Sequence, residues 1–334
     1  MIQRIIYFEK DLRNVTEMYY KVVLTALKNN HVEIISLKDR NDKYTYSKKN
    51  DYYFVTTLKD FLSLYIKGHR NYIYWFQGIE PEERNLIKHN VIKYIFFSII
   101  EKLALHVCKY KIGVSKYLFE HYMKKYHLNF NDKDCFIMPC FNTQLKIDSF
   151  QTKSKYDNNV FCYAGGMQPW QGVEYIFQIY EHIEQKHKDG VFLKIFSKDI
   201  AATKELISRY NIKNYSVQSV PQEEIDNELS TCKFGFIIRN NDIINNVATP
   251  TKLSAYIANG VIPIVSSTVK SFKDLSNQHK YICCLDDINE LSEIELMLNQ
   301  AINPQDVYKE FRDVFHDYYC FDKYVSDLQH YLSK

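Results

Sequence analysis

The chain has 334 residues, 46% hydrophobic and 25% charged, so it can bury large cores and is not an intrinsically disordered protein. Its net charge of +3 is too small to indicate nucleic-acid binding. Eight Cys without Cys-x-x-Cys spacing predict reduced thiols in a cytoplasmic protein, and the early charges of MIQRIIYFEKD do not fit a secretion signal.

Apolar runs alternate with helical patterns from the start of the chain. Strands are expected at Arg4–Phe8, Val32–Leu37, Tyr52–Val55, Tyr72–Phe76, Lys111–Val114 and Cys135–Pro139. Apolar spacing predicts helices at Val15–Lys28, near Leu58–Ile66, and from Ser115 to about Tyr126. One long helix is expected to begin at Pro81, because the acidic Glu82 and Glu83 suit a helix N-terminus.

Two segments of this half raise the question of a membrane. Lys93–Tyr110 is strongly apolar, but Glu101, Lys102 and His106 interrupt it, which favours a buried amphipathic helix over a membrane span. A second segment, His121–Tyr126, mixes cations and aromatic residues. With Lys67, His69 and Arg70 it forms either a basic face toward an anionic membrane or an ordinary solvated helix face.

The alternation stops between Asn142 and Asn159, where a polar stretch is typical of a linker. It then resumes with strands expected at Val160–Ala164, Val191–Phe196, Ser216–Val220, Phe234–Ile238 and Ile262–Ser266. Helices are expected at Gly172–His187, Lys204–Tyr210, Glu223–Ser230 and Lys252–Asn259, and an aromatic helical tail follows Pro304.

This order predicts two doubly wound, Rossmann-like α/β domains whose parallel sheets face a cleft. We expect an acceptor-binding domain at 1–145, a linker at 146–158 and a nucleotide-binding domain at 159–303. The helices of 304–334 are expected to pack back toward the first domain.

Two half-sites in the second domain suggest one bound nucleotide. In YAGGMQPWQG, Gly165 and Gly166 follow a strand and let the backbone approach a ligand, although a plain tight turn is the alternative. The segment lacks the GxGxxG pattern of NAD-binding domains. Trp170 either stacks on a ring or caps the core.

The second half-site is a polar loop followed by a helix that begins at Pro250-Thr251-Lys252. Arg239 and Lys252 flank this loop, so two cations and a helix N-terminus could hold a phosphate or diphosphate. The alternative is a solvated Lys252. That alternative is energetically less favourable, because a cation at a helix N-terminus opposes the helix dipole unless an anion is bound nearby.

Residues after two strands of the first domain are candidates for acceptor contacts: Gln77, Gly78, Glu80, Ser115 and Lys116. The alternative for Glu80 is a charge that only stabilises a helix N-terminus. We expect neither a cofactor nor a metal site, because the His residues are scattered. Asp132-Lys133-Asp134, which has the form of a carboxylate pair, fits a solvated turn better.

Taken in order, these segments resemble the retaining nucleotide-sugar glycosyltransferases of the GT-B fold, specifically glycosyltransferase family 4. The resemblance covers nearly the whole chain. It is strongest at FCYAGGMQPWQGVEYIFQIY, VPQEEIDNELSTCKFGFIIR and ATPTKLSAYIANGVIPIVSS, and weaker at WFQGIEPEE and IGVSKYLFEHYMKKY. Their combined order is specific, whereas no single segment is.

The resemblance implies metal-independent transfer of a hexosyl-type sugar, with retention, to a glycan or lipid-linked acceptor. Arg239 and Lys252 would stabilise the leaving diphosphate. The implied donor-binding residues are Gly165, Gly166, Trp170, Gln171, Ser197, Lys198, Val220, Pro221, Asn240, Thr249, Pro250, Thr251 and Tyr256. Such enzymes build bacterial capsule, lipopolysaccharide or similar polymers in the cytoplasm, and a lipid-linked acceptor would bring the protein to the inner face of the cell membrane.

The chain departs from the family pattern at several positions. Ala255 and Val247 stand where the family usually has glutamates, and Gln171 and Met167 where it has cations. Gln77 replaces a common histidine. These departures favour an alternative, a catalytically silent GT-B subunit that binds a partner transferase or a glycan. Transfer of a polyol phosphate is a third hypothesis.

Overall fold

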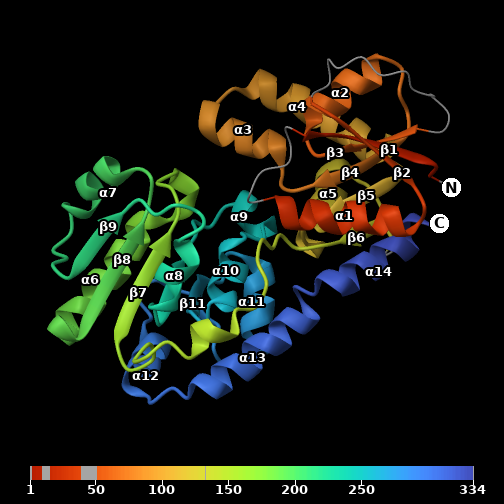
Figure 1. Cartoon of the computed structure of the whole chain (residues 1–334). Coiled ribbons are helices and arrows are strands. Elements are labelled where there is room, and N and C mark those ends of the chain that lie inside the picture. Colours follow the sequence, from red (N-terminus) through yellow and green to blue (C-terminus); the bar gives the residue numbers. More distant parts are fainter. Residues whose placement is uncertain (1, 10–15, 39–50, 132, 334) are drawn as a thin grey trace. The chain divides into compact units, whose positions relative to one another are not determined.

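The structure, a computed structural model, describes residues 2–9, 16–38, 51–131 and 133–333. The chain divides into two compact units (Figure 1). The first unit holds residues 1–142, 247–249 and 320–334, and the second holds 143–246 and 250–319. The boundaries expected from the sequence stay predictions.

The described part of the first unit contains one six-stranded parallel sheet, in the order β2-β1-β3-β4-β5-β6. Its strands are β1 (Arg4–Phe8), β2 (Glu33–Leu37), β3 (Asp51–Val55), β4 (Tyr72–Phe76), β5 (Tyr110–Gly113) and β6 (Cys135–Ile137). All five residues of β4 are buried, as expected for a central parallel strand covered on both faces.

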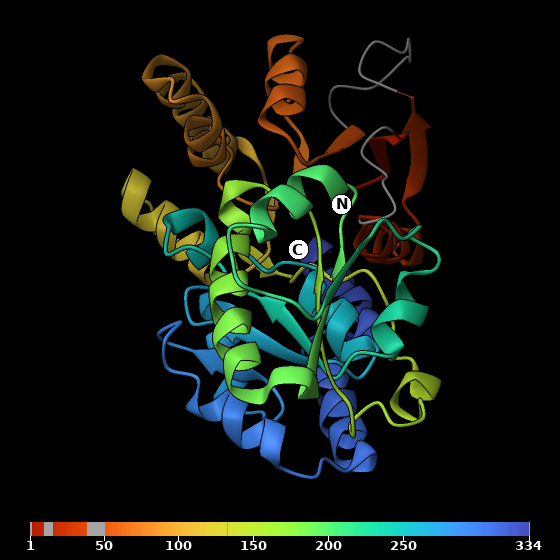
Figure 2. The same cartoon turned by 90° about the vertical axis from the view of Figure 1, so that its left-hand side faces the viewer.

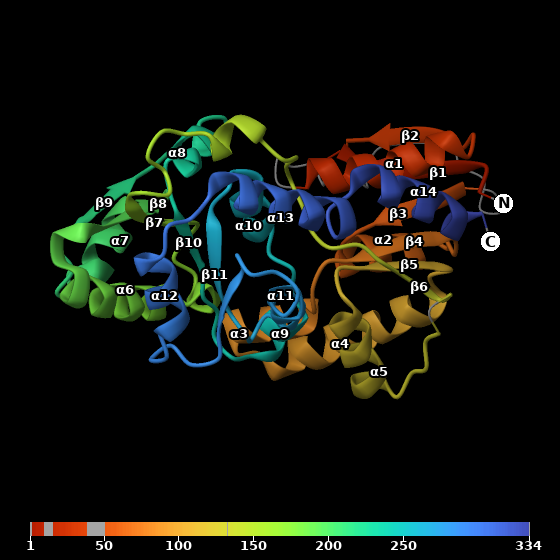
Figure 3. The ribbon, with the colours of Figure 1, turned by 90° about the horizontal axis from the view of Figure 1, so that it is seen from below.

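Helices at the two ends of the sequence meet in this unit. The blue α14 (Phe321–Leu332) lies alongside the red α1 (Glu17–Asn29) in Figures 1 and 3. The Asn30 side chain donates to the Gln329 carbonyl at 3.1 Å, and the Tyr331 hydroxyl accepts the Lys111 N–H at 3.0 Å. The preceding helix, α13 (Pro304–Asp317), belongs to the second unit, where Tyr308 packs edge-on against Phe150.

The single helix predicted from Pro81 is wrong. The structure contains α3 (Glu80–Lys88) and α4 (Val91–Val107), which pack as a hairpin beside α2 (Leu58–Ile66). His89 adopts a left-handed conformation with φ of 45°, which ends α3. The Asn90 side chain then accepts the Lys93 N–H at 2.9 Å and caps α4. Figure 2 shows the hairpin in brown, extending outward beside the orange α2.

The basic membrane face, one of two interpretations of His121–Tyr126, gains no support from the packing of these residues and stays a prediction. These residues lie on α5 (Lys116–Tyr126), where Tyr122 and Tyr126 are buried, and His69 is only 3% exposed. Lys125 forms ion pairs with Glu82 at 2.8 Å and Glu101 at 2.9 Å, so its charge is already compensated. In the part of the chain that is described, no helix is long and apolar enough to cross a bilayer.

The second unit contains another parallel sheet, six-stranded over the described residues, in the order β12-β11-β10-β7-β8-β9. Its strands are β7 (Asn159–Ala164), β8 (Val191–Phe196), β9 (Tyr215–Gln218), β10 (Phe234–Ile237), β11 (Ile262–Ser266) and β12 (Cys283–Leu285). Helices before β11 are α6 (Val173–His187), α7 (Ile200–Ile207), α8 (Ile225–Ser230), α9 (Ile243–Val247) and α10 (Lys252–Ala258). Two more helices, α11 (Lys270–Ser276) and α12 (Ser292–Asn299), flank β12. The strand β12 was not predicted from the sequence.

The direction of winding changes at β7 in this sheet. The chain moves outward from β7 to β8 and β9, then returns to place β10 on the other side of β7. Ligands of open α/β sheets bind where the strand order reverses, beyond the carboxyl ends of the strands. A ligand site is therefore expected at the loops after β7 and β10.

Candidate functional site

The carboxyl ends of β7 and β10 bring the two predicted half-sites together. Gly165 follows β7, and its N–H donates to the Phe196 carbonyl at 2.9 Å. A Cβ on Gly165 would collide with the side chain of Lys252, which arrives from the first turn of α10. Glycine at this position leaves room for the lysine ammonium beside the loop backbone.

Lys252 lies over an aromatic floor at this point. Its ammonium is 4.2 Å from the centre of the Tyr163 ring and donates to the Gln171 side-chain oxygen at 2.6 Å. Burial, and then the nearby charge of Arg239, lower the pKa of Lys252 well below its ordinary value. The side chain thus packs against the loop and is only partly exposed to solvent.

Arg239 is the second cation of the cluster and is 8% exposed. One guanidinium nitrogen donates to the Trp170 carbonyl at 3.3 Å, and its Nε has no hydrogen-bond partner among the residues that the structure describes. Burial lowers the pKa of Arg239. Within the described residues neither Arg239 nor Lys252 forms an ion pair, and the carboxylate that acts on Arg239, Asp242, is hydrogen-bonded to Asn245. Two adjacent cations without a bridging carboxylate are a candidate site for an anion.

The start of α6 lies close to the end of β10. Gly172 caps α6 with φ of +61°, and a Cβ there would lie 2.6 Å from the Ile238 carbonyl oxygen. Only glycine allows this close, left-handed turn. The first N–H groups of a helix lack partners within the helix, so this end attracts negative charge.

Sequence analysis missed three residues of the cluster. Tyr163 and Gly172 stood within the quoted motif but were not chosen. The third, Asn245, is 1% exposed and donates to the carbonyls of Asn240 at 3.1 Å and Trp170 at 3.4 Å. The feature of the sequence that could have indicated Asn245 is an amide residue within the polar loop between the two predicted cations.

The remaining predicted donor residues divide into two groups. Some lie at the loop ends of this sheet: Ser197 and Lys198 after β8, Val220 and Pro221 after β9, and Asn240, Pro250 and Thr251 around α9 and α10. Two others serve the scaffold. Tyr256 is fully buried, and its hydroxyl accepts the Ala164 N–H at 3.0 Å, which ties α10 to β7. Thr249 belongs to the first unit, where its hydroxyl accepts the Cys140 N–H at 3.1 Å.

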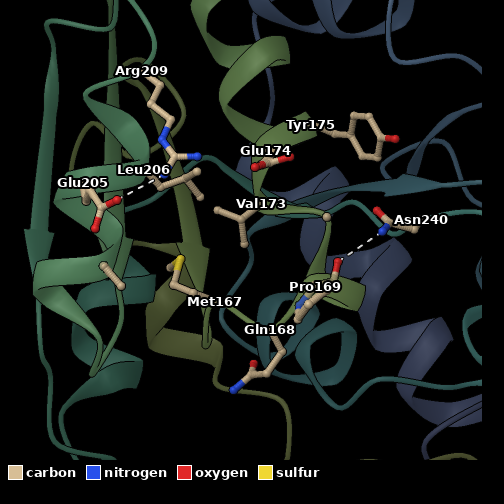
Figure 4. Close-up of a pocket in the computed structure, with 12 residues that line it drawn as sticks. Met167, Gln168, Pro169, Val173, Glu174, Tyr175, Glu205, Leu206, Arg209 and Asn240 are labelled. Carbon is tan, nitrogen blue, oxygen red and sulfur yellow. Dashed lines mark hydrogen bonds and ion pairs between the residues drawn. The ribbon is translucent and has the colours of Figure 1, made fainter. Parts of the chain in front are cut away.

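A cavity of about 440 Å³ lies beside this cluster, between the loop after β7 and helices α6 and α7 (Figure 4). Asn240 lines it and donates to the Pro169 carbonyl at 3.1 Å, whereas Arg239 and Lys252 do not line it. Its cation, Arg209, is paired with Glu205 at 3.1 Å. With Glu174 the cavity has two carboxylates against one cation, so it is a less favourable place for an anion than the Arg239–Lys252 cluster.

In the first unit, Gln77, Gly78 and Glu80 line a cavity of about 560 Å³ at the ends of β3 and β4. Glu80 accepts hydrogen bonds from the Leu58 N–H at 2.9 Å and from Arg84 Nε at 2.8 Å. Sequence analysis missed Glu83 as a lining residue, because it assigned this carboxylate to the helix N-terminus. Burial, and then the charge of Glu80, raise the pKa of Glu83 to about 7.

Ser115 and Lys116 do not line that cavity. The Ser115 hydroxyl caps α5 by accepting the Leu118 N–H, and it donates to the Val247 carbonyl at 2.7 Å. Lys116 is exposed, with its ammonium 4.9 Å from the centre of the Tyr117 ring. Among the described residues no group of His, Cys, Asp and Glu could hold a metal ion, and Asp132 of the turn lies outside them.

Solved structures share this fold. An E. coli trehalose-6-phosphate structure bound with UDP-2-fluoro glucose aligns with 98% of this chain and 99% of its own, at a TM-score of 0.63 and 10% identity. An α,α-trehalose-phosphate synthase (UDP-forming) from Burkholderia vietnamiensis aligns with 99% of each chain, at 0.63 and 10%. TarM aligns with 86% of this chain and 55% of its own, at 0.64 and 10%.

No protein-family model and no curated protein sequence matches the chain. The structural likeness confirms the predicted fold class, an α/β protein of the GT-B type with two Rossmann-like, doubly wound parallel-sheet domains. Membership of glycosyltransferase family 4 stays a prediction.

Proposed function

We propose that the protein is a glycosyltransferase and that the Arg239–Lys252 cluster binds the diphosphate of a nucleotide-sugar. The observation that carries this proposal is the pair of neighbouring cations without an ion-pair partner among the described residues. Arg239 is buried and Lys252 is partly exposed, and two like charges this close together are unfavourable unless an anion compensates them. The neighbour bound with UDP-2-fluoro glucose and the UDP-forming synthase support this class of ligand.

In the proposed reaction, the bond between the sugar C1 and the diphosphate breaks as a bond forms between C1 and an acceptor hydroxyl. The acceptor proton passes to the leaving diphosphate on the same face, so the anomeric configuration is retained. Lys252 and the free Nε of Arg239 stabilise the charge that grows on the leaving oxygen. Retention and the hexosyl specificity rest on the resemblance to family 4.

The other donor contacts follow from the loop ends of the second sheet. Gly165 and Gly166 admit the diphosphate, while Ser197, Lys198, Val220 and Pro221 would surround the nucleoside. Trp170 and Gln171 would position the two cations, because the Trp170 carbonyl accepts a hydrogen bond from Arg239 and the Gln171 side-chain oxygen accepts one from Lys252. Tyr256 supports the loop from below.

The acceptor is proposed to enter the cavity lined by Gln77, Gly78, Glu80 and Glu83. Carboxylates and an amide accept and donate hydrogen bonds in the way that sugar hydroxyls require. The products would be cell-surface polysaccharides such as capsule or lipopolysaccharide, built on a glycan or a lipid-linked acceptor at the inner face of the cell membrane.

The cavity makes a prediction about acceptor recognition. Changing Gln77 to Ala should raise the KM for the acceptor by about tenfold, the value of one lost hydrogen bond, and leave the KM for the donor unchanged. Steady-state kinetics with both substrates varied would measure this. Lys116→Ala, which lies outside the cavity, is the control. Equal effects of the two variants would remove the cavity from acceptor binding.

Donor binding should depend on pH through Lys252. A bound diphosphate favours the protonated amine, so binding raises the pKa that burial and Arg239 had lowered. Affinity is therefore highest below the pKa of the free protein and falls by about tenfold per pH unit until the pKa of the complex is reached. Calorimetric titration with UDP and GDP at several pH values would show this decline.

Lys252→Arg provides the control for that titration, because a guanidinium stays protonated throughout the range. It also corrects for the ionisation of the ligand's own phosphate. A pH dependence that is the same in both proteins would contradict the assignment of Lys252.

Transfer itself is tested by following the release of nucleoside diphosphate from UDP-, GDP-, CDP-, ADP- and dTDP-sugars with candidate glycan acceptors. The proposal expects release with one donor and a product with the donor's anomeric configuration by NMR. Tight nucleotide binding without release would instead support the silent-subunit alternative, which Ala255, Gln171 and Met167 favour.

A further inference from the structure

The α3–α4 hairpin exposes an unusual amount of apolar surface between residues 84 and 106. Seven of its side chains are large, apolar and exposed: Leu86, Ile87, Val91, Ile92, Ile95, Phe96 and Ile99. The most exposed, Ile92, has 82% of its surface accessible, and Ile99 has 64%. The opposite side of α4 is the one that packs inward, through Ile100, Ala104 and Leu105.

The sequence had predicted a buried helix here, and the structure corrects this. On a helical wheel Val91, Ile95 and Ile99 form one stripe at four-residue spacing, with Ile92 and Phe96 beside it. A helix that is apolar on its solvent side as well as its core side lacks a cover, and contiguous patches of this kind mark interaction surfaces.

The charged residues of the hairpin indicate which kind of partner binds over this apolar surface. Residues 84–106, all of which are described, expose Lys88, Lys93 and Lys102 together with His89 and His106. The carboxylate in this range, Glu101, is 1% exposed and pairs with Lys125 at 2.9 Å. The surface is therefore apolar with a cationic border. A second copy would bring the same cations against this border, which disfavours self-association.

The exposed face is continuous with the proposed acceptor cavity. Ile87, 59% exposed on the hairpin, also lines the cavity that contains Glu80 and Glu83. An acceptor whose apolar end stays in a bilayer could thus present its polar end to the cavity without leaving the membrane.

We propose that the α3–α4 hairpin docks on a bilayer that contains anionic phospholipids. The α4 helix lies in the plane of the interface with its exposed apolar side chains among the acyl chains, and the lysines contact lipid phosphates. This inference rests on the proposed function for its role: it makes the acceptor a lipid-linked one, received at the membrane surface.

The test is co-sedimentation of the full chain with vesicles of phosphatidylcholine, with and without phosphatidylglycerol. The chain should bind the anionic vesicles more tightly. Ile92→Ser/Ile99→Ser should weaken binding by about tenfold or more, because two exposed apolar side chains no longer enter the bilayer. Lys88→Gln/Lys93→Gln should weaken binding to anionic vesicles by about tenfold and leave binding to neutral vesicles unchanged.

The matched control is Ile147→Ser/Leu296→Ser, which alters apolar side chains that are 53% and 68% exposed in the second unit. It should bind vesicles as the unchanged protein does. Thermal unfolding of each variant checks that the fold is retained. UDP and GDP binding without vesicles reports on the proposed donor site separately, so failure of that site would not be confused with failure to bind lipid.

Three results would overturn the proposal. The first is absence of binding to anionic vesicles by a folded protein. The second is binding that both double variants of the hairpin leave unchanged. The third is a dimer in solution that Ile92→Ser/Ile99→Ser dissociates, since a second copy of the chain would then bind the apolar face of the hairpin.

Discussion

Replacing Lys252 by Ala should reduce kcat for sugar transfer by a factor on the order of 10² to 10³. The ammonium lies 4.2 Å from the Tyr163 ring centre and close to Gly165, where a departing diphosphate would collect negative charge. Because that charge is greatest in the transition state, the loss should appear in kcat more than in the KM for the donor.

The control for this variant is Lys309→Ala, which removes an exposed lysine of α13 in the same unit. It should change kcat by less than a factor of about three, because an exposed charge is screened by solvent. The stability of Lys252→Ala should equal or exceed that of the unchanged protein, since a cation with a lowered pKa has been removed. Normal turnover by Lys252→Ala would exclude the proposed mechanism.

Replacing Gly172 by Ala should lower the free energy of unfolding by about 2–5 kcal/mol. A left-handed residue with a Cβ costs roughly 1–2 kcal/mol, and overpacking adds about 1–3 kcal/mol. The new Cβ would lie 2.6 Å from the Ile238 carbonyl oxygen, so α6 must move away from β10. Donor affinity should fall as well, because Arg239 directly follows Ile238. Urea denaturation of the variant would measure the loss of stability.

Gly190→Ala is the matched comparison, because a Cβ at Gly190 meets no atom within 4 Å. It should change the free energy of unfolding by less than about 1 kcal/mol, the scale of the backbone-entropy term. If the two variants were equally stable, the close approach of α6 to β10 would not be a constraint on this fold.

The strands could be predicted because they are short apolar runs bounded by polar or turn residues. Arg4–Phe8, Tyr72–Phe76, Val191–Phe196 and Ile262–Ser266 match the structure residue for residue. Such runs suit parallel strands buried on both faces. The strand Cys283–Leu285 was missed although the apolar run of residues 281–285 marks it in the sequence.

The break between α3 and α4 could not be found from apolar spacing, because the spacing continues across it. Local chemistry decides it: His89 takes a left-handed conformation and Asn90 caps the next helix. The exposure of the apolar face of α4 could not be predicted for a related reason. Spacing alone does not reveal which side of an all-round apolar helix meets the core.

The candidate site was predictable where a residue type has one strong chemical use. Arg239 and Lys252 stood out as cations beside a loop and a helix start, and the structure brings them into one cluster. Tyr256 could not be distinguished from a ligand contact, because its role depends on complete burial against β7 and β10. The ring of Tyr163 and the amide of Asn245 depend likewise on packing between distant segments.

The most direct test of the diphosphate site is a thermal-shift panel of UDP-, GDP-, CDP-, ADP- and dTDP-sugars, run on the unchanged protein and on Lys252→Ala. A ligand at 100 times its dissociation constant should add about 2.7 kcal/mol of stability. We expect one nucleotide class to stabilise the protein and Lys252→Ala to lose that effect. Equal stabilisation of both proteins, or none by any nucleotide in the folded protein, would contradict the site.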